Sequence, residues 1–190
     1  MSGKLIIICA PSGAGKTTIV RHILENIPGI EFSVSATNRA QRPNEVNGVD
    51  YYFIDTESFT RKIAGDEFLE WEEVYPGTFY GTLKNEIDRI WNRGNHVIFD
   101  VDVEGGLNIK RHFGNRALLV FVRPPSIEVL KERLLARATE TEKSYNTRVA
   151  KAEREMEFEK FADYVLINDQ LKQTLPEAIQ MTENFLFKEI

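Results

Sequence analysis

The sequence contains little cysteine and no excess of basic residues. Cys9 is the one cysteine and stands inside an apolar run, so no disulfide can form within the chain and a reducing compartment is expected. Aspartate and glutamate number 29 against 24 lysine and arginine residues, which gives a net charge of −5 at pH 7. Without a basic excess the chain is a poor candidate for binding long nucleic acid, because few counterions would be displaced from its phosphates.

Long apolar runs are also missing. The longest one near the N-terminus, Leu5–Ala10, is too short for a signal peptide or a membrane span. We therefore expect a cytoplasmic protein without membrane contact. The length of 190 residues, with 42% apolar and 28% charged residues, fits a single globular unit.

Short runs rich in β-branched residues recur along the chain, and helix-like segments lie between them. The predicted strands are Lys4–Ala10, Glu31–Ala36, His96–Asp100, Ala117–Val122 and Tyr164–Ile167. The predicted helices include Thr17–Ile27, Ser126–Ala138, Glu142–Lys160 and Leu175–Phe187. The last helix is expected to begin at a capping box, Thr174–Glu177, with Pro176 in its first turn. This alternation predicts an α/β fold with a parallel sheet.

The segment Thr37–Ile90 breaks the alternation. Short aromatic runs such as Tyr51–Ile54 are separated here by prolines and glycines, which predicts an inserted, β-rich lobe. From Val34 to Ile90 there are 11 acidic and 6 basic residues, whereas the remainder of the chain holds 18 of each. The inserted lobe therefore carries the whole net charge.

A glycine-rich turn follows the first predicted strand. Ala10–Thr17 matches the phosphate-loop pattern G-x-x-x-x-G-K-[ST] at every position except the first, where Ala10 replaces glycine. Gly13 and Gly15 allow successive N–H groups to face one anion, and the next helix adds its positive end. We therefore predict a P-loop three-layer αβα fold with a mostly parallel five-stranded sheet. The expected ATP-binding residues of the loop are Pro11, Ser12, Gly13, Ala14, Gly15, Lys16, Thr17 and Thr18.

Two carboxylates stand at the end of the predicted strand His96–Asp100. Asp100 and Asp102 are two residues apart, so alternation along a strand puts them on one face, at the carboxyl end where α/β sheets bind ligands. Lys16 can reach the β- and γ-phosphate oxygens, and the Thr17 hydroxyl can ligate Mg²⁺. We expect Asp100 to support this metal through a water molecule.

The acidic lobe contains side chains that suit a second nucleotide. Arg39 and Arg42, with tyrosine hydroxyls, can clamp one phosphate through charge-assisted bonds, and ion pairs with neighbouring acids are the alternative. Glu70 lies among apolar residues, where its carboxylate can accept hydrogen bonds from the N1–H and 2-amino groups of guanine. Adenine lacks that pair of donors and would leave the carboxylate unpaired.

An ordered set of motifs extends this interpretation to nearly the whole chain, from Leu5 to about Asp169. After the phosphate loop come SVSATNRAQRP, EVNGVDYYF, FLEW, FYGT, VIFDVD and RATETEKSYNTR. In this order the motifs resemble the guanylate kinase family, whose members convert ATP and GMP to ADP and GDP. Apart from the phosphate loop no single motif is specific, but the ordered set is.

The resemblance implies roles for particular residues. It implies that the GMP phosphate is held by Arg39, Arg42, Tyr51 and Tyr80. It implies that the rest of the GMP site comprises Ser35, Glu70, Gly81, Thr82 and Asp102. Asn168 is expected near the adenine of ATP. The implied catalytic residues are Lys16, Arg39, Arg42, Arg137 and Arg148, and dGMP is a further expected acceptor.

The resemblance also divides the chain into three parts. Residues 1–33, 91–125 and 156–190 form the expected core, residues 34–90 the GMP-binding lobe and residues 126–155 a helical lid. Four places depart from the family pattern without removing a proposed ligand. They are Asn38 in place of threonine, Glu104 in place of glutamine, Ala138 in place of glycine, and one extra residue in Tyr75–Thr78.

Two other functions stay open on the sequence. A monophosphate kinase with another base preference would use the same scaffold. A non-catalytic guanylate-kinase-like module would bind protein ligands, although such modules usually have a degraded phosphate loop, and here Gly15-Lys16-Thr17 is complete. The sequence leaves open whether the chain is a monomer or a homo-oligomer.

The lid arginines give a first prediction. Arg137→Met or Arg148→Met should lower the turnover number far more than it weakens GMP binding, because these cations stabilise charge that spreads over the phosphoryl group in the transition state. Steady-state kinetics and a GMP binding titration measure the two effects. Equal losses in both quantities would contradict the role.

Overall fold

The part of the chain that the structure describes, residues 3–135 and 142–187 of this computed structural model, is built on a five-stranded sheet. In spatial order its strands are β2 (Ile30–Phe32), β7 (His96–Val101), β1 (Leu5–Cys9), β8 (Ala117–Arg123) and β9 (Tyr164–Ile167). All neighbours pair in parallel. The central strand β1 is buried along its whole length, as expected for an apolar strand covered on both faces. The predicted five-stranded parallel sheet is confirmed.

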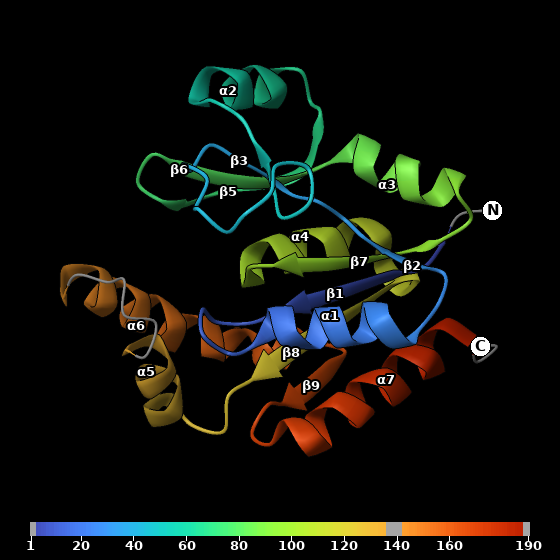
Figure 1. Cartoon of the computed structure of the whole chain (residues 1–190), viewed down its shortest axis with the longest axis vertical. Helices are drawn as coiled ribbons and strands as arrows, with labels where there is room; N and C mark the ends of the chain where they lie inside the picture. Colours follow the sequence, from blue (N-terminus) through green and yellow to red (C-terminus); the bar gives the residue numbers. More distant parts are fainter. Residues whose placement is uncertain (1–2, 136–141, 188–190) are drawn as a thin grey trace.

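Helices cover both faces of this sheet and complete three layers (Figure 1). One face packs against α1 (Lys16–Asn26), α5 (Ile127–Leu135), α6 (Glu142–Met156) and α7 (Leu171–Phe187). The other face packs against α3 (Lys84–Asn92), α4 (Val103–Phe113) and the 3₁₀ helix η2 (Glu157–Phe161). Alternate residues of β1 divide between the layers, because Ile6 and Ile8 belong to the first core and Ile7 to the second. A short 3₁₀ helix η1 (Gly114–Arg116) precedes β8.

A second, smaller sheet lies above the large one in Figure 1. Its order is β4 (Tyr52–Phe53), β3 (Ala36–Thr37), β6 (Thr78–Leu83) and β5 (Phe68–Tyr75). Helix α2 (Thr56–Ala64) covers it, with Phe59 stacked on Phe68 at 4.5 Å between ring centres. Helix α2 was not predicted, although Asp55 caps it by accepting the Ser58 N–H at 2.7 Å.

The prediction that Glu31–Ala36 form one strand is wrong. The Ser33 N–H still donates to the Ile98 carbonyl of β7 at 3.0 Å. The next N–H, that of Val34, donates instead to the buried Glu86 carboxylate at 3.2 Å. A side chain here takes the place of a strand partner, so the chain leaves the large sheet and enters β3 of the small one.

Two predicted helix boundaries are also wrong. Helix α7 begins at Leu171, so Pro176 lies inside it. The Thr174 hydroxyl donates to the Ile167 and Gln170 carbonyls at 3.0 and 3.1 Å and therefore does not cap a helix start. The predicted helix Glu142–Lys160 ends as an α-helix at Met156 and continues as η2. The predicted end at Ala138 lies outside the described residues.

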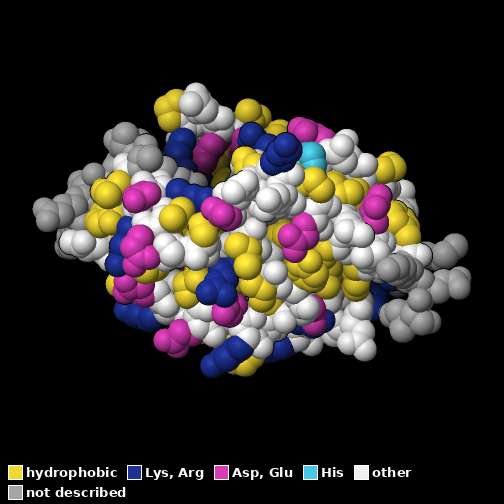
Figure 2. Space-filling view, turned by 90° about the horizontal axis from the view of Figure 1, so that it is seen from below, with side chains coloured by type: hydrophobic (Ala, Val, Ile, Leu, Met, Phe, Trp, Pro, Cys, Tyr) yellow, Lys and Arg dark blue, Asp and Glu magenta, His cyan; other side chains and the backbone are white. Residues whose placement is uncertain are grey.

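Basic, acidic and apolar side chains are interspersed on the face that Figure 2 shows. That mixture agrees with the equal numbers of basic and acidic residues outside the inserted segment. Within residues 3–135 and 142–187, no helix combines the length and the apolar character that crossing a bilayer requires.

The core of the large sheet generates a stability prediction. Phe99 of β7 is 1% exposed, so Phe99→Ala should lower the free energy of unfolding by about 3–5 kcal/mol through lost burial and the cavity left behind. Val49→Ala, at a 61% exposed side chain, should change it by less than about 0.5 kcal/mol. Urea unfolding followed by circular dichroism measures both, and equal losses would contradict this account of the core.

Candidate active site

The phosphate loop connects β1 to α1 through two residues in the left-handed region. Gly13 has a φ of 92° and Gly15 a φ of 96°. A Cβ at Gly15 would also lie 2.3 Å from Asn168 Nδ2, so the close approach of that side chain requires glycine. Gly15 provides no side-chain cap at the start of α1, so the first N–H groups of this helix favour an anion at this end of the sheet.

Lys16, Thr17 and Asp100 meet beside the loop. The Thr17 hydroxyl donates to Asp100 Oδ2 at 2.9 Å. Lys16 Nζ donates to the Ala10 carbonyl at 3.1 Å and lies 3.8 Å from Asp100 Oδ1. The parallel pairing of β1 with β7 produces this arrangement, because both strands end at the same edge of the sheet.

The oxygen donors at this place fit Mg²⁺. Thr17 supplies a hydroxyl and Asp100 a carboxylate. In the described part of the chain, no group of three or more histidine, cysteine, aspartate or glutamate side chains could form a metal cage. Mg²⁺ suits such a sparse donor set because it usually keeps waters and binds substrate phosphates beside one or two carboxylates.

A cavity of about 220 Å³ opens between the loop, the small sheet and α6. It collects residues from five separate stretches of the sequence, within 10–16, 35–51, 70–81, 100–102 and 148–155. The predicted site residues that line it are Ser12, Lys16, Ser35, Arg39, Arg42, Tyr51, Glu70, Tyr80, Gly81, Asp100, Asp102 and Arg148.

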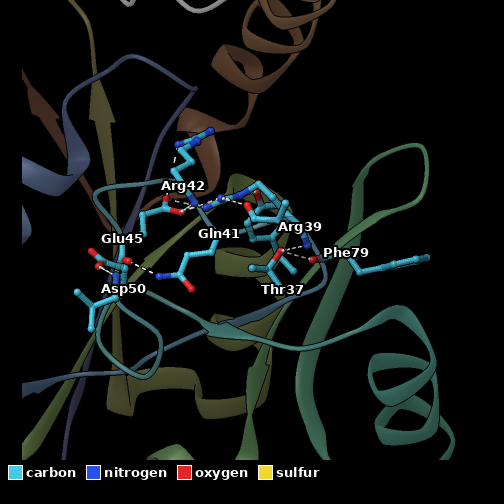
Figure 3. Close-up of polar contacts among 10 residues, drawn as sticks. Thr37, Arg39, Gln41, Arg42, Glu45, Asp50 and Phe79 are labelled. Carbon is cyan, nitrogen blue, oxygen red and sulfur yellow. Dashed lines mark hydrogen bonds and ion pairs between the residues drawn. The ribbon is translucent and has the colours of Figure 1, made fainter.

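Arg39 and Arg42 converge on one carboxylate, that of Glu45 (Figure 3). Arg39 donates to both Glu45 oxygens at 2.8 Å and, through Nε, to the Tyr80 hydroxyl at 3.0 Å. The Arg42 backbone N–H donates to Glu45 at 2.8 Å, and its guanidinium lies 3.7 Å away. The hydrogen bonds with Glu45 raise the pKa of Arg39. The same bonds from Arg39 lower the pKa of Glu45. A pair of arginines that holds a carboxylate in this way has the geometry for a phosphate.

Tyr51 completes this cluster. Its ring meets that of Tyr80 edge-on at 5.7 Å, and the Arg39 guanidinium lies 5.3 Å from its ring centre. Burial raises the pKa of the Tyr51 hydroxyl, so the phenol stays protonated and can donate a hydrogen bond. Two tyrosines and two arginines therefore present donors to one corner of the cavity.

Glu70 lines the same cavity and is 9% exposed. Strand β5 carries it, and burial raises the pKa of its carboxyl to about 7. A Cβ at Gly105 would lie 2.7 Å from Glu70 Oε2, so α4 can approach only because glycine stands there. A Cβ at Gly81 would lie 2.9 Å from the Glu70 carbonyl. Gly105 and Gly81 therefore leave the room that Glu70 needs, because a side chain at either position would lie too close to it.

Asp102 lies at the start of α4 and not on a strand, because β7 ends at Val101. Its Oδ1 accepts the Gly105 N–H at 2.9 Å, which caps the helix. Asp102 and Asp100 nevertheless line the same cavity, as the sequence spacing predicts.

Thr82, Asn168 and most of the predicted phosphate-loop residues are not among the residues that line the cavity. Those loop residues are Pro11, Gly13, Ala14, Gly15, Thr17 and Thr18. Thr82 is fully buried opposite Glu70 in the β5–β6 pair. Asn168 is 4% exposed and donates to the Ala14 carbonyl at 2.7 Å, so it supports the phosphate loop from within the protein. Arg133 donates to the Asn168 carbonyl at 3.1 Å, and Arg137 lies outside the described residues.

Four polar cavity residues were missed by the sequence analysis, namely Glu72, Tyr75, Lys151 and Glu155. Two spacings contain the signal. Glu72 follows Glu70 by two residues on a strand and so shares its face. Lys151 follows Arg148 by three residues on a helix and shares that face.

This protein combines a phosphate loop on an all-parallel sheet with a small sheet that lines the other part of the same cavity and could hold a phosphate acceptor. These features define a P-loop kinase. The guanylate kinase family model matches residues 2–185. A guanylate kinase of Bacteroides thetaiotaomicron is 47% identical over 189 residues, which cover 100% of this chain and 93% of that protein. One from Thermotoga maritima is 39% identical over 184 residues, or 97% and 88% of the two chains.

A solved structure agrees with these relatives. The crystal structure of guanylate kinase from Anaplasma phagocytophilum matches with a TM-score of 0.80 at 27% identity, over 98% of this chain and 88% of that one. The chain belongs to the guanylate kinase family, and it is an enzyme of the kinase class. The resemblance in the sequence motifs is thereby confirmed.

The burial of Glu70 generates a prediction on pH. Its native pKa of about 7 lies above the ordinary value of 4.5, so the native state keeps a proton that the unfolded state has lost. Stability should therefore fall as the pH rises from about 4.5 to 7, by about 3 kcal/mol for this group. Glu70→Gln removes this loss, so the variant should gain stability relative to the unsubstituted protein over that range.

Urea unfolding at about pH 4.5 and pH 8 measures the difference. Glu183→Gln, at an exposed position of α7, is the matched control and should show no such trend. A constant difference between Glu70→Gln and the unsubstituted protein at both pH values would contradict the raised pKa.

Proposed function

We propose that this enzyme transfers the γ-phosphoryl group of ATP to GMP, and also to dGMP, giving ADP and the nucleoside diphosphate. One observation carries the proposal: a single cavity is lined by Lys16 and Asp100 from the phosphate-loop side and by Arg39, Tyr80 and Glu70 from the small sheet. Membership of the guanylate kinase family supports the same reaction. The reaction belongs to purine nucleotide metabolism, and we expect it in the cytoplasm.

ATP would lie with its phosphates in the loop Pro11–Thr18. Lys16 would exchange its bond to the Ala10 carbonyl for the β- and γ-phosphate oxygens. Thr17, and Asp100 through a water molecule, would hold Mg²⁺. The metal, when bound, offsets the negative charge of the phosphates and orients them. Asn168 would act on ATP indirectly, by holding the loop at Ala14.

GMP would bind across the other side of the cavity. Arg39, Arg42, Tyr51 and Tyr80 would hold its phosphate, in the corner where Glu45 now engages both arginines. Glu70 would accept hydrogen bonds from the N1–H and 2-amino groups of guanine, beside Ser35, Gly81, Thr82 and Asp102. Because Glu70 is buried, a base without these donors would leave a desolvated carboxylate unpaired, which disfavours adenine and uracil.

The chemistry needs positioning and charge stabilisation more than a base. An oxygen of the GMP phosphate is anionic at neutral pH and attacks the γ-phosphorus directly. Lys16 and the arginines Arg39, Arg42, Arg137 and Arg148 would stabilise the charge of the transition state. Closure of the lobe and the lid would exclude water, which otherwise hydrolyses ATP. The complete Gly15-Lys16-Thr17 segment of the phosphate loop argues against a non-catalytic interaction module.

A coupled assay for ADP release tests the proposal, with ATP, Mg²⁺ and one of GMP, dGMP, AMP, UMP or dTMP. We expect kcat/KM for GMP to exceed that for AMP, UMP and dTMP by about 100-fold or more. Lys16→Ala should lower the GMP rate by about 100-fold or more, because a cation at the transferring phosphates is lost.

Comparable rates with all five acceptors would contradict the guanine assignment. ADP release that does not depend on any acceptor would instead indicate a simple ATPase.

A further inference from the structure

Lys151 of α6 lies among acidic side chains from three different elements. Its Nζ is 3.5 Å from Asp102 Oδ2 at the start of α4, 4.0 Å from Glu72 Oε1 on β5, and 3.6 Å from Glu155 Oε1 on α6 itself. It also lies 5.9 Å from the ring centre of Tyr75. One ammonium thus joins the small sheet, the edge of the large sheet and α6.

The acids around this ammonium need a counter-charge. Glu70, Glu72, Asp102 and Glu155 all line the cavity. Burial raises the pKa of the Glu70, Glu72 and Glu155 carboxyls, whereas hydrogen bonding from Glu72 and Gly105, with the charge of Lys151, lowers that of Asp102 against the effect of burial. The negative charge of the cluster is therefore concentrated on Asp102, next to Lys151. Glu72 Oε2 is buried and has no hydrogen-bond partner among the described residues. Lys151 is the cavity-lining cation within 4.0 Å of three of these carboxylates.

Lys151 also restricts the carboxylate that faces the guanine side. Asp102 Oδ1 is engaged by the Gly105 N–H at 2.9 Å. Asp102 Oδ2 faces Lys151 at 3.5 Å, so the two contacts together define the plane of the carboxylate. The ammonium pairs tightly with none of its three acids, and Oδ2 therefore keeps room to accept a ligand donor.

We propose that Lys151 is a positioning residue for guanine recognition: it holds Asp102 and Glu72 in place and so connects α6 to the base-binding side of the cavity. The inference rests on the proposed GMP kinase activity, in which Asp102 and Glu70 bind the base. Its consequence is that a residue of the lid contributes to base selection. A purely structural lysine would instead fasten α6 without regard to the base.

Kinetics of Lys151→Met with ATP and either GMP or inosine monophosphate tests this role. Inosine monophosphate lacks the 2-amino group, so it reports how much selectivity the acids provide. We expect the KM for GMP to rise about tenfold, with kcat changed less than about threefold and the KM for ATP less than about twofold. The preference for GMP over inosine monophosphate should fall, and Lys151→Arg should restore most of it.

Lys131→Met is the matched control. Lys131 on α5 pairs with Glu153 on the same helix α6 at 3.0 Å, but neither residue lines the cavity. This variant should leave the KM for GMP and the base preference unchanged. Lys151→Gln removes the charge with a smaller loss of polarity and should repeat the methionine result if Lys151→Met does not fold.

Two results would overturn the inference. One is an unchanged KM for GMP in both Lys151→Met and Lys151→Gln. The other is an equal rise in KM for GMP, inosine monophosphate and ATP, which would indicate a structural role only. If the unsubstituted enzyme forms no ADP with GMP, the proposed function fails together with this inference; an active enzyme with unaffected variants contradicts the inference alone.

Discussion

The parallel pairing of β1 with β7 is the constraint on which the site depends. In this register Ile8 is paired with Asp100 and Cys9 with Val101, so both strands end at one edge of the sheet. The phosphate loop and α1 follow the first strand, and Asp102 with α4 follows the second. Parallel strands direct their carboxyl ends the same way, so the N-termini of α1 and α4 meet at this edge without any long-range loop. Lys16, Asp100 and Asp102 lie at the same place.

A buried carboxylate links this edge to the small sheet. Glu86, 3% exposed at the start of α3, accepts hydrogen bonds from the Val34 N–H, the Tyr52 hydroxyl and Arg89. Val34 lies where the chain leaves the large sheet, and α3 lies where it returns. The same side chain thus ties both connections of the inserted segment together. Breaking one partner of such a network leaves a buried charge unpaired, so the network restricts where the small sheet can lie over the phosphate loop.

The sequence predicted the elements whose signals are local, and it missed those that depend on contacts between elements. The apolar run of β1 and the pattern from Gly13 to Thr17 identified the central strand and the loop, because burial and backbone conformation dictate those residues directly. Helix α2 also had a local signal, an Asp55 cap and a closing Gly65, which the aromatic runs of the lobe concealed. The split after Phe32 had no local signal, since its cause is a bond from Val34 to Glu86, 52 residues away. The contact of Asn168 with Ala14 likewise had no local signal, because the two residues are 154 positions apart in the sequence.

Three cations of the cavity, Arg39, Lys16 and Lys151, are engaged by protein groups. Arg39 is engaged by Glu45 and Tyr80, Lys16 by Ala10 and Asp100, and Lys151 by three carboxylates. Each cation is therefore held in place before a nucleotide arrives, which reduces the entropy lost on binding. Nucleotide binding then replaces a protein partner of each cation by a phosphate oxygen. The net free energy of binding is therefore smaller in magnitude than the sum of the new contacts. Glu70 differs, because burial leaves it with a raised pKa. Its protein partner is the neutral Thr82 and no cation, so the larger share of selectivity should come from this carboxylate and the larger share of orientation from the arginines.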